Sequence, residues 1–368
     1  MLALNDLKVV DLGTMVTAPL ATMLLGQLGA EVVKVEHPDG GDPFRRTAGD
    51  DYSPNFVAYN QNKTSIQADL TTDAGRAVLF DVLAKADILV ENFRPGVMEK
   101  LGLTQAVLKA VNPTLIHCTI TGFGADGPYS HRPAYDTVGI ALSGMLHLYL
   151  DPDKPQILGP TISDNVTGLY AFAGVLAALH ARSRTGEAQR VELNMLECAI
   201  AFIPDAFSYF GQKGVSYGPR SRAASSQCFV WQCSDGKAIA VHLSVPAKFW
   251  NGLVAALEVE GTLGADARFA ERKGRLNHYE DLSVEVGKII ALNPRSHWED
   301  AFSRHDIPFA NVNSIPEVID DPQVRHLKTF QKAHHPVKGD VLCIRNPIEI
   351  NDIHGRVVAP PLLGGRAS

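Results

Sequence analysis

The sequence lacks the long apolar runs that a membrane-spanning protein needs. Its most apolar stretches are interrupted by charged residues well before the roughly 18 residues that would cross a bilayer. The first residues, MLALNDLKVVDLG, contain no basic segment followed by an apolar core, so we expect no signal peptide. We therefore predict a cytoplasmic protein that has no membrane partner.

Cysteine is also scarce. An odd number of five with irregular spacing indicates reduced thiols rather than a disulfide framework. The five are Cys118, Cys198, Cys228, Cys233 and Cys343. Cys228 and Cys233 lie close together, but no second pair of ligands accompanies them, which argues against a zinc site.

Basic residues do not outnumber acidic ones. The 368 residues include 34 Lys and Arg against 40 Asp and Glu, which gives a net charge of −6. Because this balance provides no broad basic surface, we exclude nucleic acid as a partner. An anionic ligand would have to meet a local cluster of cations and backbone N–H groups. Hydrophobic residues make up 45% and charged residues 20%, as is ordinary for a globular chain long enough for two domains.

What the sequence does have is a regular alternation of strand and helix patterns in its first half. Strands are predicted at 7–13, 31–36, 87–92 and 114–121, and helices at 19–30, 72–86 and 166–184. A further helix is predicted to open with Pro in PGVMEKLGL, after the third of these strands. Such alternation is typical of an α/β fold with a parallel sheet and helices on both faces.

The second half mixes strands and helices without this regularity. Residues 188–207 read as a strand that passes into a helix, and a DG turn within 214–244 indicates a hairpin. Helices are predicted around 246–257, 279–292 and 296–305. We therefore divide the chain into a large domain at 1–210, a smaller α+β domain at 214–325, and a tail at 326–368 that returns to the large domain.

One motif suggests a dinucleotide site and fails on inspection. Residues 122–127, GFGADG, match the G-x-G-x-x-G pattern after a predicted strand. That site requires a helix to begin at the motif, with its N-terminus facing a pyrophosphate. Pro133 would interrupt such a helix, so we exclude nicotinamide chemistry. The glycines still permit a close approach of the backbone to a ligand.

Asp164 stands in GPTISDNVTG, immediately before a long apolar run. On the residues alone two readings are open. An Asp before a helix is a favoured N-cap, worth about 1 kcal/mol. Alternatively it is a nucleophile, and a helix N-terminus favours the ionised carboxylate that a nucleophile needs.

Six segments, at 7–45, 60–70, 86–103, 112–138, 162–197 and 266–278, carry a resemblance to a known family. Together, and in the same order, they resemble the class III CoA-transferase family, also called the CaiB/BaiF family. This family includes formyl-CoA and carnitine-CoA transferases and the α-methylacyl-CoA racemases. The resemblance implies a Rossmann-like large domain, a coenzyme A thioester as substrate and no tightly bound cofactor or metal. It also implies a ring-like subunit interlocked with a second one as a homodimer.

The resemblance assigns the nucleophile to Asp164, within the D-x-x-x-G pattern that Asp164 and Gly168 form. In such an enzyme the carboxylate attacks the acyl-CoA, and the enzyme then carries first the acyl group and next the CoA. The racemase branch instead has a His before the Asp that corresponds to Asp136, where this chain has Tyr135. A tyrosine with a pKa of about 10 is a poor base near neutral pH, which weighs against the racemase. Tyr135 is then either a packed aromatic or a border of the acyl or pantetheine end.

The resemblance also implies a set of CoA-contacting residues. We expect the loop at 13–19 to present backbone N–H groups to the ligand, because it precedes a helix. The family positions that line the CoA site correspond to Val16, Ala18, Leu70, Asn92, Phe93, Arg94 and Lys100. Core packing is the alternative for Leu70 and Phe93, and a solvated helix face is the alternative for Lys100.

Two departures bear on specificity. Formyl-CoA transferases carry an Arg where His37 stands, and a glycine-rich loop where this chain has GPRSRAASSQ. Arg220 and Arg222 in that segment either bind an acceptor carboxylate or are exposed loop residues. We predict a CoA-transferase acting on an acyl-CoA and a carboxylic acid acceptor. A racemase or isomerase of the same fold, or a non-catalytic acyl-CoA-binding protein, is the alternative.

Overall fold

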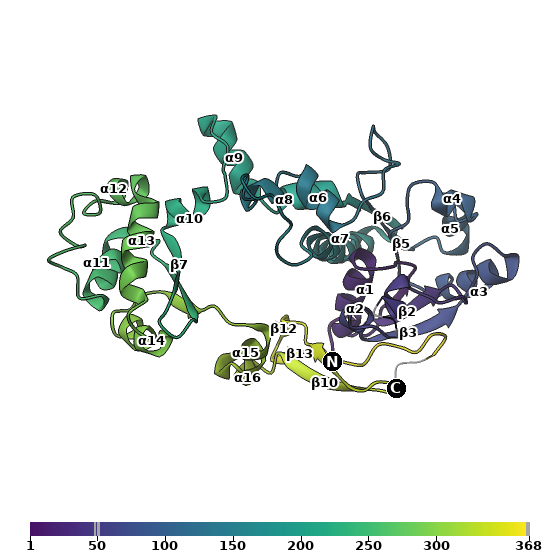
Figure 1. Cartoon of the computed structure of the whole chain (residues 1–368). Helices are drawn as coiled ribbons and strands as arrows, with labels where there is room; N and C mark the ends of the chain where they lie inside the picture. The colour runs from purple at the N-terminus through teal and green to yellow at the C-terminus, as the bar shows by residue number, and fades with distance from the viewer. Residues whose placement is uncertain (48, 50–51, 366–368) are drawn as a thin grey trace. The chain divides into compact units, whose positions relative to one another are not determined.

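The structure is a computed structural model that describes residues 1–47, 49 and 52–365 (Figure 1). Within these residues, no helix is long and apolar enough to cross a membrane. The chain packs into two compact units. One consists of Met1–Leu146, Gln156–Pro204 and Asp321–Ser368, and the other of His147–Pro155 and Asp205–Asp320.

In the described part of the larger unit, six strands form one sheet in the order β3-β2-β1-β4-β5-β6. Every neighbouring pair is parallel. The strands are β1 Lys8–Asp11, β2 Glu31–Glu36, β3 Lys63–Gln67, β4 Ile88–Glu91, β5 Ile116–Thr121 and β6 Gln189–Asn194. The predicted parallel α/β fold is therefore confirmed.

Helices cover both faces of this sheet. Helices α1 (Thr17–Gln27) and α7 (Ser163–Thr185) pack on one face, and α3 (Asp73–Leu83), α4 (Val97–Lys100) and α5 (Gln105–Val111) on the other. All residues of α1 are buried, because the helix is enclosed between the sheet and α7. The apolar residues of alternate strand positions face the two helical layers, as expected for strands buried on both sides.

Between β5 and α7 the chain forms the short helix α6 (Asp136–Leu142) and the 3₁₀ turn η2 (Leu146–Leu148). No helix begins at GFGADG among the described residues, which agrees with the exclusion of a dinucleotide fingerprint. The remaining helices of the larger unit are α2 Pro54–Tyr59, α8 Met195–Ala201 and α16 Pro322–Leu327, and η1 is Pro43–Arg46.

The tail runs back along the large sheet. It contains the hairpin β10 (Phe330–His335) and β11 (Gly339–Ile344) and the short strands β12 (Glu349–Ile350) and β13 (Ile353–His354). Its last residues accept hydrogen bonds from β3 and from the residue before it. The N–H of Asn62 donates to the carbonyl of Val358 at 3.1 Å, and the N–H of Ser65 donates to the carbonyl of Gly365 at 2.9 Å. These bonds tie the tail to β3, an edge strand of the sheet.

The smaller unit has its own core. Strands β7 (Cys228–Gln232), β8 (Ala238–His242) and β9 (Phe309–Asn311) form an antiparallel sheet. Gly236 turns the β7–β8 hairpin with a φ of 76°, where a glycine is needed. Its helices are α9 Pro204–Lys213, α10 Ser221–Ser226, α11 Pro246–Ala256, α12 Arg272–Asn277, α13 Tyr279–Ile290, α14 Arg295–Arg304 and α15 Ile315–Asp320.

Candidate active site

The strand order reverses direction between β1 and β4, and a crevice forms where their carboxyl ends diverge. In open parallel sheets this switch point is the usual place for a ligand. The loop after β1 and the loop after β4 are tied together there by Asn92. Its side chain accepts the N–H of Thr14 at 3.0 Å, and donates to the carbonyl of Thr14 at 2.8 Å and to Oγ1 of Thr17 at 2.9 Å.

Buried charged side chains hold the β1–α1 loop through hydrogen bonds to its backbone. Oδ1 of Asp11 accepts the N–H of Gly13 at 2.8 Å, and Oδ1 of Asp42 accepts the N–H of Met15 at 3.2 Å. Nζ of Lys34 donates to the carbonyl of Gly13 at 2.7 Å and pairs with Asp42 at 2.9 Å. The N–H groups of residues 13–15 are thus hydrogen-bonded within the protein, which narrows the expectation that the loop at 13–19 presents N–H groups to a ligand. The donors left for one begin at Val16, the N-cap of α1, which has no side-chain cap.

Asp164 does not cap its helix. Helix α7 begins at Ser163, its N-cap is Ile162, and Asp164 lies within the first turn. The cap comes from another helix: Oδ1 of Asp136 accepts the Oγ–H of Ser163 and the N–H of Asp164, both at 3.3 Å. The capping alternative for Asp164 is therefore wrong, and its carboxylate is not used to satisfy the start of its own helix.

Gly168, one turn after Asp164, brings α7 against α1. A Cβ at this position would lie 2.9 Å from the carbonyl oxygen of Thr17 and from Cδ2 of Leu20. Because real Cβ atoms do not approach so closely, only glycine lets α7 meet the first turn of α1 here. The D-x-x-x-G pattern therefore has a steric reason: Gly168 places Asp164 over the end of the β1–α1 loop.

A cavity of about 330 Å³ lies at this point. Its lining residues come from the loops after β1, β4 and β5 and from the starts of α7 and α8. They are Thr14, Met15, Val16, Thr17, Asn92, Phe93, Arg94, Pro95, Val97, Ile120, Thr121, Gly122, Ser130, Arg132, Ala134, Tyr135, Asp164 and Met195. The structure thus brings Asp164 together with five of the residues expected from the sequence, namely Val16, Asn92, Phe93, Arg94 and Tyr135.

Three expected contacts lie elsewhere. Ala18 is fully buried in α1, and Lys100 is exposed at the end of α4, and neither lines this cavity. Leu70 lines an adjacent cavity of about 220 Å³, which also contains His37 and shares Thr14 and Phe93 with the first. Leu70 and Phe93 both pack against the core as well, so the two readings given for them are compatible.

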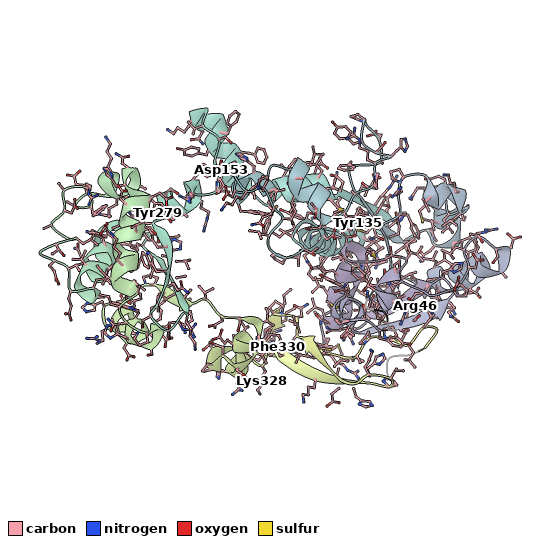
Figure 2. All side chains as sticks on the ribbon, in the orientation of Figure 1. Arg46, Tyr135, Asp153, Tyr279, Lys328 and Phe330 are labelled. Carbon is pink, nitrogen blue, oxygen red and sulfur yellow. The ribbon has the colours of Figure 1, made fainter. Side chains whose placement is uncertain are left out.

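For Tyr135 and Arg220 the sequence left two alternatives open, and the structure bears on both. Tyr135 is 61% exposed at the start of α6, so it is not a packed core aromatic in this chain (Figure 2). Arg220 belongs to the smaller unit and forms an ion pair with Glu280, so its charge is already matched by a carboxylate.

Sequence reasoning missed several residues of the cavity, above all Arg132. Its guanidinium lies 3.9 Å from the centre of the Tyr129 ring. Gly122 lines the cavity too, and a Cβ there would lie 2.4 Å from the Cβ of Ala134. The glycine motif after β5 therefore serves to let the 130–135 segment fold over the strand end. Arg132 could have been found from the sequence, because it lies between this glycine motif and Tyr135.

The acidity of Asp164 is perturbed. Burial of the half-buried carboxyl, together with the negative charge of Asp136, raises the pKa of Asp164 to about 7. Burial and the charge of Asp136 therefore oppose the ionised form that a helix N-terminus favours. A carboxylate of raised basicity is a better nucleophile once ionised, and perturbed groups in cavities are typical of reactive sites.

Within the described residues, no group of three or more His, Cys, Asp or Glu side chains is arranged to hold a metal ion. The charged residues of the cavity lining are one carboxylate residue, Asp164, and two arginines, Arg94 and Arg132. Such a set suits an acyl group and anionic substrates.

Comparison with known proteins identifies the family. The chain matches CoA-transferase family III over residues 4–367. Acetyl-CoA:oxalate CoA-transferase from Acetobacter aceti is 32% identical over 377 residues, which cover 97% of this chain and 92% of that protein. Succinyl-CoA:glutarate CoA-transferase from Mus musculus is 28% identical over 372 residues, covering 98% of this chain and 84% of that protein. The crystal structure of a CaiB/BaiF family protein from Brucella suis matches with a TM-score of 0.88 at 30% identity, and covers 98% of this chain and 96% of that one.

The fold, the match over almost the entire chain and the relatives confirm the resemblance seen in the sequence. The chain belongs to CoA-transferase family III, the CaiB/BaiF family, and is an enzyme, a CoA-transferase.

Proposed function

We propose that this enzyme moves CoA between an acyl-CoA thioester and a free carboxylic acid through covalent intermediates on Asp164. The observation that carries this proposal is the place of Asp164: a half-buried carboxylate, not used as a cap, that lines the cavity at the switch point of the sheet. Val16, Asn92, Phe93, Arg94 and Tyr135 line the same cavity and are proposed as CoA contacts.

The first half of the reaction loads the enzyme. An oxygen of ionised Asp164 bonds to the thioester carbonyl carbon, the C–S bond breaks, and its electron pair leaves with sulfur as CoA thiolate. The product is a mixed anhydride. The thiolate then bonds to the carbonyl carbon of Asp164 and the donor acid leaves as its carboxylate, so that CoA remains on the enzyme as a thioester.

The second half reverses these steps with another acid. The acceptor carboxylate attacks the carbonyl carbon of the Asp164 thioester and expels CoA thiolate, which gives a second anhydride. The thiolate attacks the acceptor's acyl carbon, and Asp164 leaves as a carboxylate. No proton, metal or redox partner is consumed, so we propose a coenzyme A thioester as the substrate and no tightly bound cofactor.

We further propose that one of the two acids is a short dicarboxylic acid. Two of the relatives are named for oxalate and for glutarate. The cavity provides Arg94 and Arg132, whose guanidinium groups match carboxylates and phosphates in geometry. One carboxylate of such an acid would react while the other meets a guanidinium group.

Two wider features of the enzyme are also proposals. We propose an interlocked homodimer, which is supported by helix α9: none of its residues is buried, and Phe207 and Phe210 are exposed on it. Light scattering of the purified chain tests this. We propose a cytoplasmic location because the odd, irregular set of five cysteines indicates reduced thiols.

Intact-protein mass spectrometry tests the function. The enzyme is incubated with acetyl-, formyl-, succinyl- and other short acyl-CoAs without an acceptor, and adducts are located by peptide mapping. We expect an added mass of CoA or acyl group on the peptide that contains Asp164, absent in Asp164→Asn. The exposed Asp153, in the smaller unit, supplies the control Asp153→Asn, which should load like the wild type (Figure 2). Exchange of the substrate's α-proton with solvent in the absence of any adduct would contradict the proposal and favour the racemase.

A further inference from the structure

Asp136 is the polar residue most closely connected to the start of α7, and it does not line the cavity. Its backbone carbonyl accepts the Oγ–H of Ser163 at 3.0 Å, in addition to the two bonds to its carboxylate described above. Ser163 is fully buried and Asp136 is half-buried. One residue of α6 thus satisfies both the buried hydroxyl and a free N–H of the first turn of α7.

The packing around these bonds is tight. A Cβ on Gly139, three residues after Asp136, would lie 2.5 Å from Oγ of Ser163. Gly139 therefore lets α6 approach α7 closely enough for the Asp136 bonds to form. This contact fixes the position of the backbone of Asp164 directly, through its N–H.

Asp136 also places a negative charge beside Asp164, and this charge contributes to the perturbed acidity of Asp164. The other titratable groups that line the cavity are Arg94, from the loop after β4, and Arg132 and Tyr135, from the segment before α6. The lining residues from α1 and α8, which are Thr17 and Met195, do not titrate. The two cations belong to the walls where substrate would lie, whereas Asp136 lies behind the nucleophile.

We propose that Asp136 is a positioning residue for the transfer reaction: it fixes the first turn of α7, and its charge repels ionised Asp164, so that acylation of Asp164 relieves this repulsion. The proposal rests on the proposed function of Asp164. When Asp164 forms its bond to the acyl carbon, its negative charge leaves with the CoA thiolate, and the two carboxylates no longer repel each other. Asp136 therefore shifts the equilibrium between free and loaded enzyme toward the loaded form.

Two variants separate the charge from the positioning. Asp136→Asn keeps an oxygen that can accept both hydrogen bonds but removes the charge. Ser163→Ala keeps the charge and removes the hydroxyl bond. The pH dependence of kcat/KM and the fraction of enzyme loaded at a fixed ratio of acyl-CoA to free acid are measured for both.

For Asp136→Asn we expect the midpoint of the pH profile to fall by about one unit and the ratio of loaded to free enzyme to fall about tenfold, since one pKa unit corresponds to a tenfold change in an equilibrium. Ser163→Ala should keep the wild-type midpoint and lose rate. An Asp136→Asn enzyme with the wild-type midpoint and the wild-type loaded fraction would overturn the proposal.

A second measurement needs no activity. Urea midpoints at pH 8 are compared for the wild type, Asp136→Asn, Asp164→Asn and the double variant. Repulsion between the two carboxylates predicts that either single change raises the midpoint and that the double variant gains less than the sum. If the changes in urea midpoint are additive while the wild-type enzyme still forms an adduct, only the proposed role of Asp136 is overturned. Non-additive changes with no adduct on the wild type would show instead that the proposed function of Asp164 has failed, and the role of Asp136 in loading with it.

Discussion

Asp11 and Asp164 border the same loop after β1, yet their surroundings are opposite. Asp11 is fully buried, with Nζ of Lys63 at 2.8 Å and Nζ of Lys34 at 3.6 Å. Burial alone would raise the pKa of Asp11, but the two ammonium groups and the bonds from Lys63 and Gly13 outweigh it and hold that pKa below its usual value. Asp164 is less buried, and its carboxylate neighbour Asp136 adds to the effect of burial, which raises its pKa to about 7.

The difference separates a structural carboxylate from the one proposed as the nucleophile. The charge of Asp11 is matched by buried cations, so its ionised form is the stable one and it holds the loop. The charge of Asp164 is poorly compensated, so the group gains by becoming neutral. Acylation is one way to become neutral, and protonation is the other. The same residue type thus supports the loop in one place and suits the proposed reaction in the other, according to which charges the fold places beside it.

The largest effect that this comparison predicts is on activity. Asp164→Asn removes the proposed nucleophile and should lower the rate of CoA transfer by at least about 10³-fold, because an uncharged amide cannot form the proposed anhydride. Steady-state transfer from an acyl-CoA to a carboxylic acid measures it, with Asp153→Asn as the control that should stay within about twofold. A residual rate close to that of the wild type would mean that Asp164 is not the nucleophile.

The next effect is on stability, through Asp11. Asp11→Asn removes one charge of a buried cluster and leaves Lys63 without its carboxylate partner. Removing one partner of a buried ion pair costs about 3–5 kcal/mol. Because the pKa of Asp11 is lowered in the folded state, this contribution is present above about pH 4 and is lost as the pH falls through the folded-state pKa. Urea unfolding at pH 7 measures the loss. A change below 1 kcal/mol would show that the cluster does not stabilise the fold as the comparison requires.

Asp164→Asn should change the free energy of unfolding in the opposite direction from Asp11→Asn. The folded-state pKa of Asp164 is raised from 3.8 to about 7, so between these values the folded state holds a proton that the unfolded state has released. Wild-type stability therefore falls as the pH rises through this window. Relative to the wild type, Asp164→Asn should be nearly equal at pH 4 and more stable by about 2–4 kcal/mol at pH 8. If the variant is no more stable than the wild type at pH 8, the carboxylate is better compensated than its surroundings indicate.

Gly168→Ala tests the close contact between α7 and α1. The added methyl group would meet the carbonyl of Thr17 and the side chain of Leu20 at 2.9 Å, so α7 must move away from α1. Overpacking of this kind costs about 1–3 kcal/mol. The movement displaces Asp164 as well, so we expect a loss of kcat of about tenfold or more, whereas Gly261→Ala, in a turn of the smaller unit where a Cβ would meet nothing within 4 Å, should change neither stability nor kcat. Equal behaviour of the two variants would mean that the close approach of the helices is not required.

The sequence predicted more of the sheet than of the site. The strands at β1, β2, β4 and β5 follow apolar runs, but β3 was not predicted, because its buried positions are Lys63 and Ser65 rather than apolar residues. Two carboxylates of the ion cluster that includes Lys63 also accept loop N–H groups, Asp11 that of Gly13 and Asp42 that of Met15. The pattern around Asp164 was visible, but the cap from Asp136 was not, because it joins residues 28 positions apart. Side-chain contacts across such distances have no local signature.

The smallest expected effect concerns Lys100, and it extends the comparison from carboxylates to lysines. Lys34 and Lys63 are fully buried and form ion pairs with Asp11, whereas Lys100 is exposed on α4 and lines neither cavity. An exposed cation contributes about 0.2–1 kcal/mol through space, so Lys100→Ala should raise the KM for acyl-CoA by less than about fivefold. The increase should disappear in about 0.5 M salt, which screens exposed charges. Arg94→Ala, which changes a residue of the cavity wall, is the matched variant and should raise KM more and persist in salt. A rise above about thirtyfold for Lys100→Ala, retained in salt, would instead show that Lys100 contacts a phosphate of CoA directly, as the family resemblance implies.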